Sequence, residues 1–217
     1  MRGNAEIGKR MTGRWPAKRL FDLLLTIPGI VLIAPLLIPI ALLIKSRLGR
    51  PVLFRQIRPG QHGRPFVMAK FRTMTDQRDE SGRLLPDAQR LTGLGSYLRA
   101  SSLDELPALW CVLKGDMSLV GPRPLLMKYL DRYTPAQSRR NEMKPGITGL
   151  AQVNGRNAIG WEEKFRLDVW YVDHWSVWLD IKILWLTVRK VLKREGISAT
   201  GQATMPEFLG SEFNLQD

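Results

Sequence analysis

An uncharged apolar run of 22 residues, Leu23 to Ile44, places the strongest constraint on how this chain can fold. A helix needs about 20 apolar residues to cross a bilayer, so the run is long enough to do so. Three prolines, Pro28, Pro35 and Pro39, lie inside it. An interior proline removes a backbone hydrogen bond and costs a helix roughly 3 kcal/mol. The run therefore indicates a membrane segment whose helix is broken.

Basic residues flank the apolar run on both sides. Arg10, Arg14, Lys18 and Arg19 precede it, and Lys45, Arg47 and Arg50 follow it. Lysine and arginine beside a membrane segment favour the cytoplasmic side, so both ends favour the same side. A helix that enters the bilayer, breaks and returns meets this requirement. Because the residue before a proline is biased away from the α region, the predicted break falls at Ala34-Pro35.

Other interpretations of the apolar run stay open. A single-pass anchor is the main rival, because proline occurs in genuine transmembrane helices. A signal peptide has a shorter apolar region followed by small residues, whereas this run ends at Ile44-Lys45. A fully buried helix of a soluble protein is a third alternative.

Charge, cysteine and histidine limit the chemistry that the chain can perform. The 33 Lys and Arg exceed the 20 Asp and Glu, giving a net charge of +13. Such a chain attracts nucleic acid or anionic lipid, and the apolar run favours lipid. Cys111 is the only cysteine, and His62 and His174 are the only histidines. A disulfide within the chain is thereby excluded, and catalysis must depend on carboxylates, hydroxyls and cations.

The predicted elements indicate an α+β, mostly helical fold. We expect a re-entrant membrane helix and a small globular domain with a short β-hairpin and amphipathic interfacial helices. The expected parts are a basic tail over 1–17, the membrane helix over 18–45, the globular domain over 46–197 and a C-terminal tail over 198–217. The expected strands are 51–56 and 65–72, and the expected helices are 87–97, 102–113, 125–142 and 161–195.

Five of the seven tryptophans lie between Trp161 and Trp185. One face of this predicted helix carries Trp178, Ile181, Trp185, Val188 and Leu192. An ordinary amphipathic helix packing a core is one interpretation. Tryptophan beside lysine and arginine also suits a helix at a membrane surface, and the apolar run gives that second interpretation weight.

Ser102-Leu-Asp-Glu105 is the densest local signal for chemistry. Its structural interpretation is a capping box, with Ser102 as the N-cap and Glu105 in the first turn. Its functional interpretation is a pair of adjacent carboxylates, Asp104 and Glu105, that hold Mg²⁺, which prefers oxygen ligands. One of them could also act as a nucleophile, since carboxylates form covalent intermediates such as aspartyl-phosphates. The two interpretations are compatible.

Cations suited to a diphosphate accompany the carboxylate pair. They are Lys70, Arg72, Arg99, Arg123 and Arg156. Each alone has the alternative of a solvated surface charge. Arg123 stands out because Pro122 and Pro124 hold it on both sides, which favours a fixed guanidinium for bidentate phosphate contact. The chain lacks GxxxxGK[ST] and GxGxxG motifs, so a nucleoside triphosphatase or Rossmann cofactor site has no support.

Longer motifs across residues 18–197 resemble a known family, the small monotopic phosphoglycosyl transferases, also called bacterial sugar transferases. The matching segments are Lys18-Arg-Leu-Phe-Asp22, Gly60, Lys70-Phe-Arg-Thr-Met74, Arg99-Ala-Ser-Ser-Leu-Asp-Glu-Leu-Pro107, Leu113-Lys-Gly-Asp-Met-Ser-Leu-Val-Gly-Pro-Arg-Pro-Leu125, Lys144-Pro-Gly-Ile-Thr-Gly149, Gln152-Val-Asn-Gly-Arg-Asn157 and Asp168 to Tyr171. The resemblance is greatest to minimal members that start glycan assembly for protein glycosylation.

The resemblance implies an activity and a set of roles. The expected enzyme passes a sugar 1-phosphate from a UDP-sugar to polyprenyl (undecaprenyl) phosphate and releases UMP. Asp104 would be the nucleophile and Glu105 its partner, with Mg²⁺ at the pair. The substrate-binding positions would be Lys70, Arg99, Pro122, Arg123, Pro124 and Arg156. The family breaks its membrane helix at a Ser-Pro pair, where this chain has Ala34-Pro35.

The resemblance also implies a location and partners. We expect a monotopic protein of the bacterial inner membrane, with its catalytic domain on the cytoplasmic face and with no nucleic-acid partner. A UDP-linked N-acetylated or di-N-acetylated amino sugar is the expected donor, hexoses stay open, and a homodimer is one alternative for the oligomeric state. Two rivals are a catalytically silent membrane scaffold and a basic nucleic-acid binder. The intact Asp104-Glu105 pair speaks against the first, and the apolar run against the second.

Overall fold

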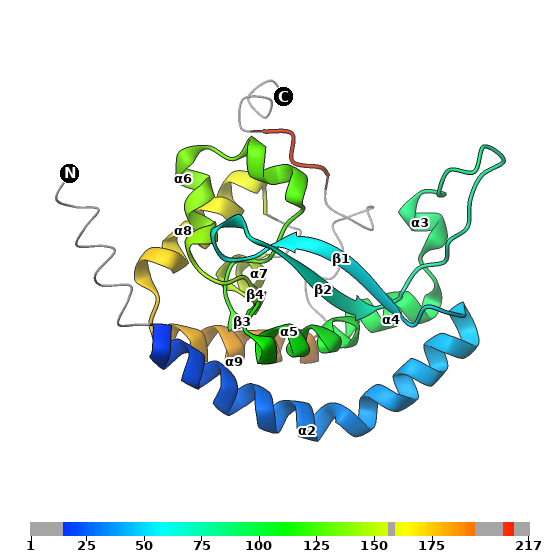
Figure 1. Ribbon diagram of the computed structural model, residues 1–217, viewed down its shortest axis with the longest axis horizontal. Coiled ribbons are helices and arrows are strands. Elements are labelled where there is room, and N and C mark those ends of the chain that lie inside the picture. Colours follow the sequence, from blue (N-terminus) through cyan, green and yellow to red (C-terminus); the bar gives the residue numbers. More distant parts are fainter. Residues whose placement is uncertain (1–14, 156–158, 194–205, 211–217) are drawn as a thin grey trace.

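The computed structural model describes residues 15–155, 159–193 and 206–210. Helices dominate these residues, and the strands form two small sheets of two strands each. The α+β, mostly helical class expected from the sequence is confirmed. Figure 1 shows a globular body resting above one long bowed helix, α2.

Helix α2, Trp15–Leu48, is the predicted membrane element. It begins three residues earlier and ends three residues later than the expected range of 18–45. The predicted break at Ala34-Pro35 is wrong, because the helix continues through both residues without interruption. Instead of breaking once, α2 bends along its length into an arc whose two ends meet the globular body (Figure 1).

The spacing of the three prolines explains why α2 bends without breaking. Pro35 and Pro39 follow Pro28 by seven and eleven residues, close to two and three turns of a helix. The prolines therefore share one face of α2, and all three are exposed. Each removes a hydrogen bond on that face, and helices curve where such bonds are missing or longer. The opposite face carries Ile40 and Ile44, which are buried against the body.

The predicted β-hairpin is confirmed. Strands β1, Leu53–Pro59, and β2, Pro65–Phe71, pair antiparallel from Leu53↔Phe71 to Pro59↔Pro65. The short turn η1, Gln61–Gly63, joins them. Beyond β2, residues 73–92 form an arm that carries α3, Asp87–Arg90, and projects from the body (Figure 1).

The remaining predicted helices are present but divided. The observed elements are α4 Gly93–Ala100, η2 Leu103–Ala108, α5 Leu109–Lys114, η3 Met127–Arg132, α6 Pro135–Ser138, η4 Arg139–Glu142, α7 Leu150–Asn154, α8 Trp161–His174 and α9 Val177–Lys193. Two of the divisions fall where a side chain starts a new cap. Thr92 accepts a hydrogen bond from Gly95 N and starts α4, and Thr134 with Gln137 forms a capping box that starts α6.

The sequence does not predict the second sheet, which consists of two parallel strands. Strands β3, Ser118–Val120, and β4, Gly146–Thr148, pair through Ser118↔Gly146 and Val120↔Thr148. A Cβ atom on Gly146 would lie 2.1 Å from the backbone nitrogen of Gly121, so the two backbone segments approach too closely for any side chain at Gly146. This sheet fixes the start of the segment that follows β3.

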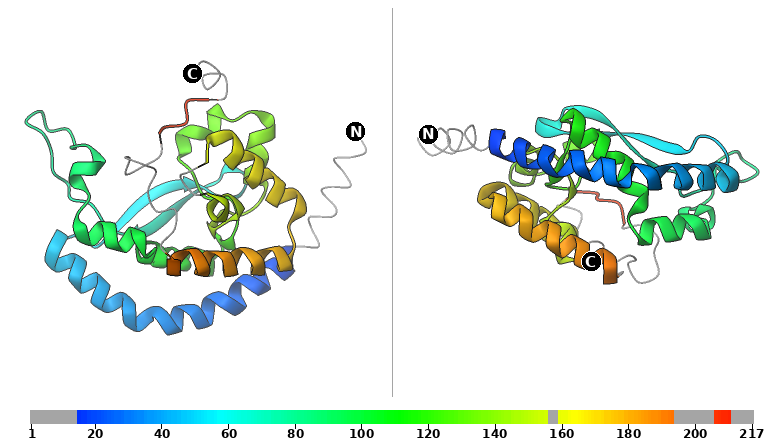
Figure 2. Two further views of the ribbon diagram at one scale, coloured as in Figure 1. Left: turned by 180° about the vertical axis from the view of Figure 1, so that it is seen from behind. Right: turned by 90° about the horizontal axis from the view of Figure 1, so that it is seen from below.

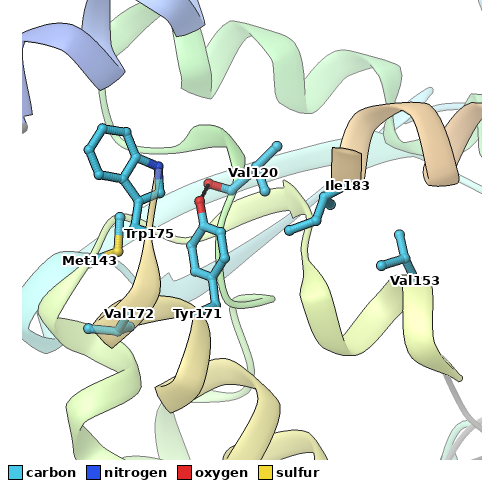
Figure 3. Packing of buried hydrophobic residues seen from close by; sticks show 7 residues of the cluster. All are labelled: Val120, Met143, Val153, Tyr171, Val172, Trp175 and Ile183. Atoms are coloured by element: carbon cyan, nitrogen blue, oxygen red, sulfur yellow. Dashed lines mark hydrogen bonds between the residues drawn. The ribbon is translucent and has the colours of Figure 1, made fainter. Parts of the chain in front are cut away.

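The largest core cluster joins this sheet to the C-terminal helices (Figure 3). Val120, Met143, Val153, Tyr171, Val172, Trp175 and Ile183 form it. The hydroxyl of Tyr171 lies 3.1 Å from the carbonyl oxygen of Val120 and 2.6 Å from Asp180 Oδ1, and the indole nitrogen of Trp175 donates to Asp180 Oδ2 at 3.0 Å, so the polar side-chain groups of the cluster are satisfied. A second cluster contains Phe208 from the predicted C-terminal tail, with 0% of its surface exposed. Residues 206–210 therefore belong to the globular body.

Apolar side chains also cover an outer surface. In Figure 1 α9, α5 and α4 lie in a row above the arc of α2, and Figure 2 shows the same arrangement from behind. Trp178 and Trp185 of α9 are 75% and 60% exposed, and Trp110 of α5 is 59% exposed. The tryptophan face of α9 therefore does not pack a core, which leaves the interfacial interpretation. We name α2, α9 and Trp110 together the apolar surface.

Candidate functional site

The predicted carboxylate pair lies in the first turn of η2. Asp104 is buried, with 5% of its surface exposed, and Glu105 is partly buried. The capping-box prediction is wrong at this point, because Ser102 makes no side-chain cap and has a left-handed φ of 57°. A non-glycine residue in this region is uncommon and often lies at a functional site. The tight 3₁₀ geometry of η2 places both carboxylates beside the hairpin and the Pro-Arg-Pro segment.

Arg123 binds Glu105 with both ends of its guanidinium. Nη2 lies 2.5 Å from Glu105 Oε1, and Nη1 lies 3.4 Å from Oε2. Pro122 and Pro124 are buried on either side, whereas Arg123 is exposed between them. The carbonyl oxygen of Pro122 accepts a hydrogen bond from Gly146 N at 3.0 Å. The two prolines and β4 thus hold the main chain on either side of Arg123, and the role of Arg123 in phosphate contact stays a prediction.

The environment of Asp104 opposes its ionisation only in part. Burial, followed by the neighbouring Glu105 charge, raises the pKa of Asp104 from 3.8 to about 6. The charges of Lys70, Arg123 and Arg99 act in the opposite direction. At pH 7 the carboxylate is therefore mostly ionised but poorly solvated, which is the state in which an oxygen nucleophile is most reactive.

The structure brings Lys70 and Arg99 to the same site. Lys70 lies near the end of β2, and its Nζ is 5.7 Å from the centre of the Phe54 ring. Burial, followed by the charge of Arg123, lowers the pKa of Lys70, while Asp104 raises it. Arg99 of α4 donates from Nε to Thr73 Oγ1 at 3.1 Å. These two cations and Arg123 act together on Asp104.

Two further cations belong to the site and lack a prediction from the sequence. Burial and the charge of Arg123 lower the pKa of Arg58 to about 10, and Glu105 raises it. Burial and the charge of Arg123 lower the pKa of Lys164 to about 8. Lys164 also lies over the ring of Trp161, with Nζ 5.0 Å from the ring centre. Neither residue lies in a distinctive motif, and only the fold brings them to Arg123.

A buried ion pair supports the Pro-Arg-Pro segment from behind. Arg140 Nε and Nη2 lie 3.0 and 2.6 Å from Asp168 Oδ2. The same Nη2 donates to the carbonyl oxygen of Arg123 at 2.8 Å. Both ion-pair side chains are at most 5% exposed. Asp168 therefore orients Arg140, and Arg140 fixes the main chain of Arg123.

Two candidate cations fall outside this arrangement. Arg72 binds the carbonyl oxygens of Leu48 and Arg50 and the carboxylate of Asp76, so it supports the chain after α2 and does not serve the site. Arg156 lies outside the described residues.

The carboxylate pair suits a magnesium ion that takes its other ligands from substrate phosphates. Within residues 15–155, 159–193 and 206–210, no group of three or more His, Cys, Asp or Glu side chains could hold a metal. Mg²⁺ is commonly bound through one or two carboxylates together with substrate phosphates, and does not need an all-protein cage. Asp104 and Glu105 carry adjacent carboxylates, which would supply such a partial ligand set.

The site combines a buried carboxylate with cations that suit an anionic ligand, and the body that holds it carries an exposed apolar helix. Together these features define a membrane-associated protein. The chain belongs to the bacterial sugar transferase family, whose sequence profile matches residues 13–194. It is a transferase of this family.

Three relatives show how the chain relates to longer members. The uncharacterized sugar transferase EpsL of Bacillus subtilis is 59% identical over 194 residues, which cover 89% of this chain and 96% of EpsL. A UDP-galactose-lipid carrier transferase of Erwinia amylovora is 42% identical, covering 82% of this chain and 41% of that protein. A UDP-glucose:undecaprenyl-phosphate glucose-1-phosphate transferase of Klebsiella pneumoniae is 40% identical, covering 80% and 39%. The chain thus spans nearly all of one relative and about two-fifths of the others.

Proposed function

We propose that this protein transfers a sugar 1-phosphate from a UDP-sugar to polyprenyl (undecaprenyl) phosphate, as the first membrane step of glycoconjugate assembly. The observation that carries the proposal is the buried Asp104 carboxylate, ionised at neutral pH and surrounded by Lys70, Arg99 and Arg123. Relatives whose names specify UDP-sugars and undecaprenyl phosphate support the donor and the acceptor.

The reaction proceeds in two displacements at one phosphorus atom. An Asp104 carboxylate oxygen attacks the phosphorus that bears the sugar, and the bond from that phosphorus to UMP breaks, so that UMP leaves with the bonding electrons. A phosphate oxygen of the lipid acceptor then attacks the same phosphorus and displaces the Asp104 carboxylate. A polyprenyl diphosphate sugar results, and Asp104 is regenerated. The covalent step lets a soluble donor and a membrane acceptor use one site in turn.

The surrounding residues stabilise charge and orient the groups that react. Lys70, Arg99 and Arg123 lie where they can bind the oxygens of the transferred phosphate and the departing nucleotide. Mg²⁺ bound by Asp104, Glu105 and substrate phosphates would offset the negative charge that accumulates during transfer. Glu105 also orients the Arg123 guanidinium, whose Nη2 lies 2.5 Å from Glu105 Oε1. Burial of Asp104 limits the access of water, which would hydrolyse the intermediate.

The proposed membrane position follows from α2. It is the one helix within the described residues that is long and apolar enough to cross a membrane, and only 11% of its most apolar window is buried. Its N-terminal end contacts the body through Lys18 and Asp22, and its C-terminal end contacts the same body through Ile40 and Ile44. Both ends therefore lie on one side of the bilayer, which the basic flanks make the cytoplasmic side, and the arc enters the lipid from there.

The test is release of UMP by the full chain in detergent or nanodiscs with Mg²⁺ and undecaprenyl phosphate. The donors are UDP-N-acetylglucosamine, a UDP-di-N-acetylated sugar, UDP-galactose and UDP-glucose. We expect one donor to release UMP, and Asp104→Asn to abolish the release by removing the nucleophile. Asp131→Asn, at an exposed carboxylate, is the control. Full activity of Asp104→Asn would refute the covalent role, and inactivity with every donor would favour a silent scaffold.

A further inference from the structure

A cavity of about 440 Å³ lies beside the N-terminal end of α2, apart from the carboxylate pair. Its lining consists of Pro16, Lys18, Arg19, Asp22, Gln61, Ser118 and Lys144. Arg19 reaches the carbonyl oxygens of Val112 and Leu113 in the last turn of α5. Asp104 lies in the first turn of η2, nine residues before Leu113. Neither Asp104 nor Glu105 lines the cavity.

Two of the charged groups in the lining already have partners. Lys18 Nζ forms an ion pair with Asp180 Oδ2 at 2.7 Å. Asp22 Oδ1 accepts hydrogen bonds from Ser118 Oγ at 3.0 Å and from Leu119 N at 3.1 Å. These contacts hold α2 against the body and build one wall of the cavity. They leave the charges of Arg19 and Lys144 to be accounted for.

Arg19 and Lys144 converge in this cavity, where Asp22 supplies the one carboxylate of the described lining. Both approach Gly115, where a Cβ atom would lie 3.5 Å from Lys144 Nζ and 3.6 Å from Arg19 Nη2. Arg19 donates only to backbone carbonyls, and within the described part of the chain Lys144 has no ion pair or side-chain hydrogen bond. Burial, followed by the charge of Arg19, lowers the pKa of Lys144, while the charges of Asp22 and Asp116 raise it. Two half-buried cations in one cavity favour the binding of an anion.

The position of the cavity indicates what carries that anion. Pro16 lines the cavity, and Leu20 and Leu24 follow it at intervals of four residues, so the three share one face of α2. Leu20 and Leu24 are 59% and 63% exposed. A cationic cavity that opens next to an exposed apolar face suits a ligand with an anionic head and a hydrocarbon chain.

We propose that this cavity binds the phosphate group of a membrane lipid, with Arg19 and Lys144 contacting the phosphate oxygens and the lipid chain following Leu20 and Leu24. A lipid held there would fix the depth of α2 in the bilayer and hence the height of the transferase site above it. The inference rests on the proposed membrane position of α2, and it does not depend on the transfer chemistry.

The test measures binding by the full chain in a non-ionic detergent. Dihexanoyl phosphatidic acid supplies a lipid phosphate, inorganic phosphate supplies the free anion, and dihexanoylglycerol lacks the phosphate. The readout is the rise in melting temperature with ligand concentration. We expect phosphatidic acid to stabilise the protein, and Lys144→Gln to raise the half-saturating concentration about tenfold, as loss of one charge-assisted contact predicts.

Matched variants separate the cavity from general surface charge. Lys144→Arg keeps the cation and should bind like the wild type. Lys114→Gln removes an exposed lysine that pairs with Asp116 and does not line the cavity, and it should change binding by less than about twofold. Equal binding of inorganic phosphate would support the site with a free anion as its source. Equal stabilisation by dihexanoylglycerol, or unchanged binding by Lys144→Gln, would overturn the proposal.

UMP release by the same variants distinguishes this inference from the proposed function. Unaltered binding by Lys144→Gln together with normal UMP release would refute the lipid site alone. Binding that depends on Lys144 in a protein that releases no UMP would refute the transferase proposal alone.

Discussion

Asp104 has two properties that rarely occur together at a carboxylate, because its side chain is 5% exposed and yet mostly ionised at neutral pH. Burial raises its pKa, and three cations prevent the pKa from rising further. An ionised carboxylate that water solvates poorly is reactive, but it destabilises the fold that holds it. Asp104 should therefore show a conflict between stability and activity.

Asp104→Asn should stabilise the protein at neutral pH while abolishing transfer. The rise of about two pKa units corresponds to about 3 kcal/mol, at about 1.4 kcal/mol per unit. Because the folded-state pKa lies above the ordinary value, the carboxyl group favours folding below about pH 4, and this contribution is lost as the pH rises through about 6. The gain in Asp104→Asn should thus be greatest above about pH 7 and should vanish near about pH 4.

Melting temperatures measured across this pH range test the expectation. Asp131→Asn, at an exposed carboxylate, should show no comparable gain. A variant Asp104→Asn that is less stable than the wild type at pH 7 would mean that the cations depend on the carboxylate more than burial opposes it.

Arg140 should act as a positioning residue for Arg123. Arg140→Lys keeps the positive charge but cannot bind both Asp168 and the carbonyl oxygen of Arg123 with one rigid guanidinium. We expect KM for the UDP-sugar to rise about tenfold, with a smaller change in kcat, because donor binding depends on the placement of Arg123. Steady-state UMP release measures both constants.

The neighbouring arginine supplies the control for this prediction. Arg139 forms an ion pair with Asp173 at the surface, so Arg139→Lys should leave KM nearly unchanged. Equal effects of Arg139→Lys and Arg140→Lys, or an unchanged KM in Arg140→Lys with a normal melting temperature, would contradict the positioning role.

At the scale of the element, α2 docks on the body by different chemistry at its two ends. Its N-terminal end uses polar contacts, with Lys18 bound to Asp180 and Asp22 bound to Ser118. Its C-terminal end uses apolar contacts, with Ile40 and Ile44 in a cluster with Phe71 and Leu98. The exposed middle of the helix between these contacts is free to lie in lipid.

Asp180→Asn should weaken the polar end strongly. Asp180 is fully buried and accepts from Lys18 Nζ, the Tyr171 hydroxyl and the Trp175 indole nitrogen. Removing its charge leaves Lys18 buried and unpaired, and breaking such a pair typically costs about 3–5 kcal/mol. Denaturant unfolding in detergent measures the loss.

Two comparisons identify the cause of that loss. Asp173→Asn breaks an exposed ion pair with Arg139 and should cost less than about 1 kcal/mol. The double variant Lys18→Met with Asp180→Leu removes both charges and should recover much of the lost stability. A single Asp180→Asn variant no less stable than Asp173→Asn would show that the ion pair does not hold α2.

At the scale of the whole molecule, the arc of α2 and helix α9 both lie below the body (Figures 1 and 2), and both carry exposed apolar side chains. A straight helix of 34 residues would be about 50 Å long, enough to separate its ends across a bilayer. The bend along the proline face returns both ends to the same body. The proposed membrane topology is therefore a consequence of tertiary contacts at the two ends.

Cysteine labelling should find both ends of α2 on the cytoplasmic face. With Cys111→Ser as the background, Ala17→Cys and Arg47→Cys should both resist a membrane-impermeant maleimide added outside intact cells and react after lysis. Pro35→Ala alone should keep this result, since Pro28 and Pro39 share the bend. Labelling of one position from outside would establish a single-pass anchor and refute the re-entrant topology.

Local motifs made part of the site predictable. Asp104 and Glu105 are adjacent, and Arg123 stands between two prolines, so each carries a signature within a few residues. Arg140 and Lys164 carry no such signature. Arg140 contacts Asp168, 28 residues away in the chain. The partners of such residues are chosen by packing, which no local pattern specifies.

The amino-acid sequence by itself determined the apolar run with its basic flanks, the hairpin, the carboxylate pair and the family. Each depends on composition or on residues close together in the chain. Only the tertiary structure decided that α2 bends instead of breaking, that the tryptophan face of α9 stays exposed, and that Arg19 and Lys144 converge. These outcomes depend on contacts between segments that lie far apart in the chain, such as Lys18 with Asp180, and on the balance of burial and charge that those contacts create.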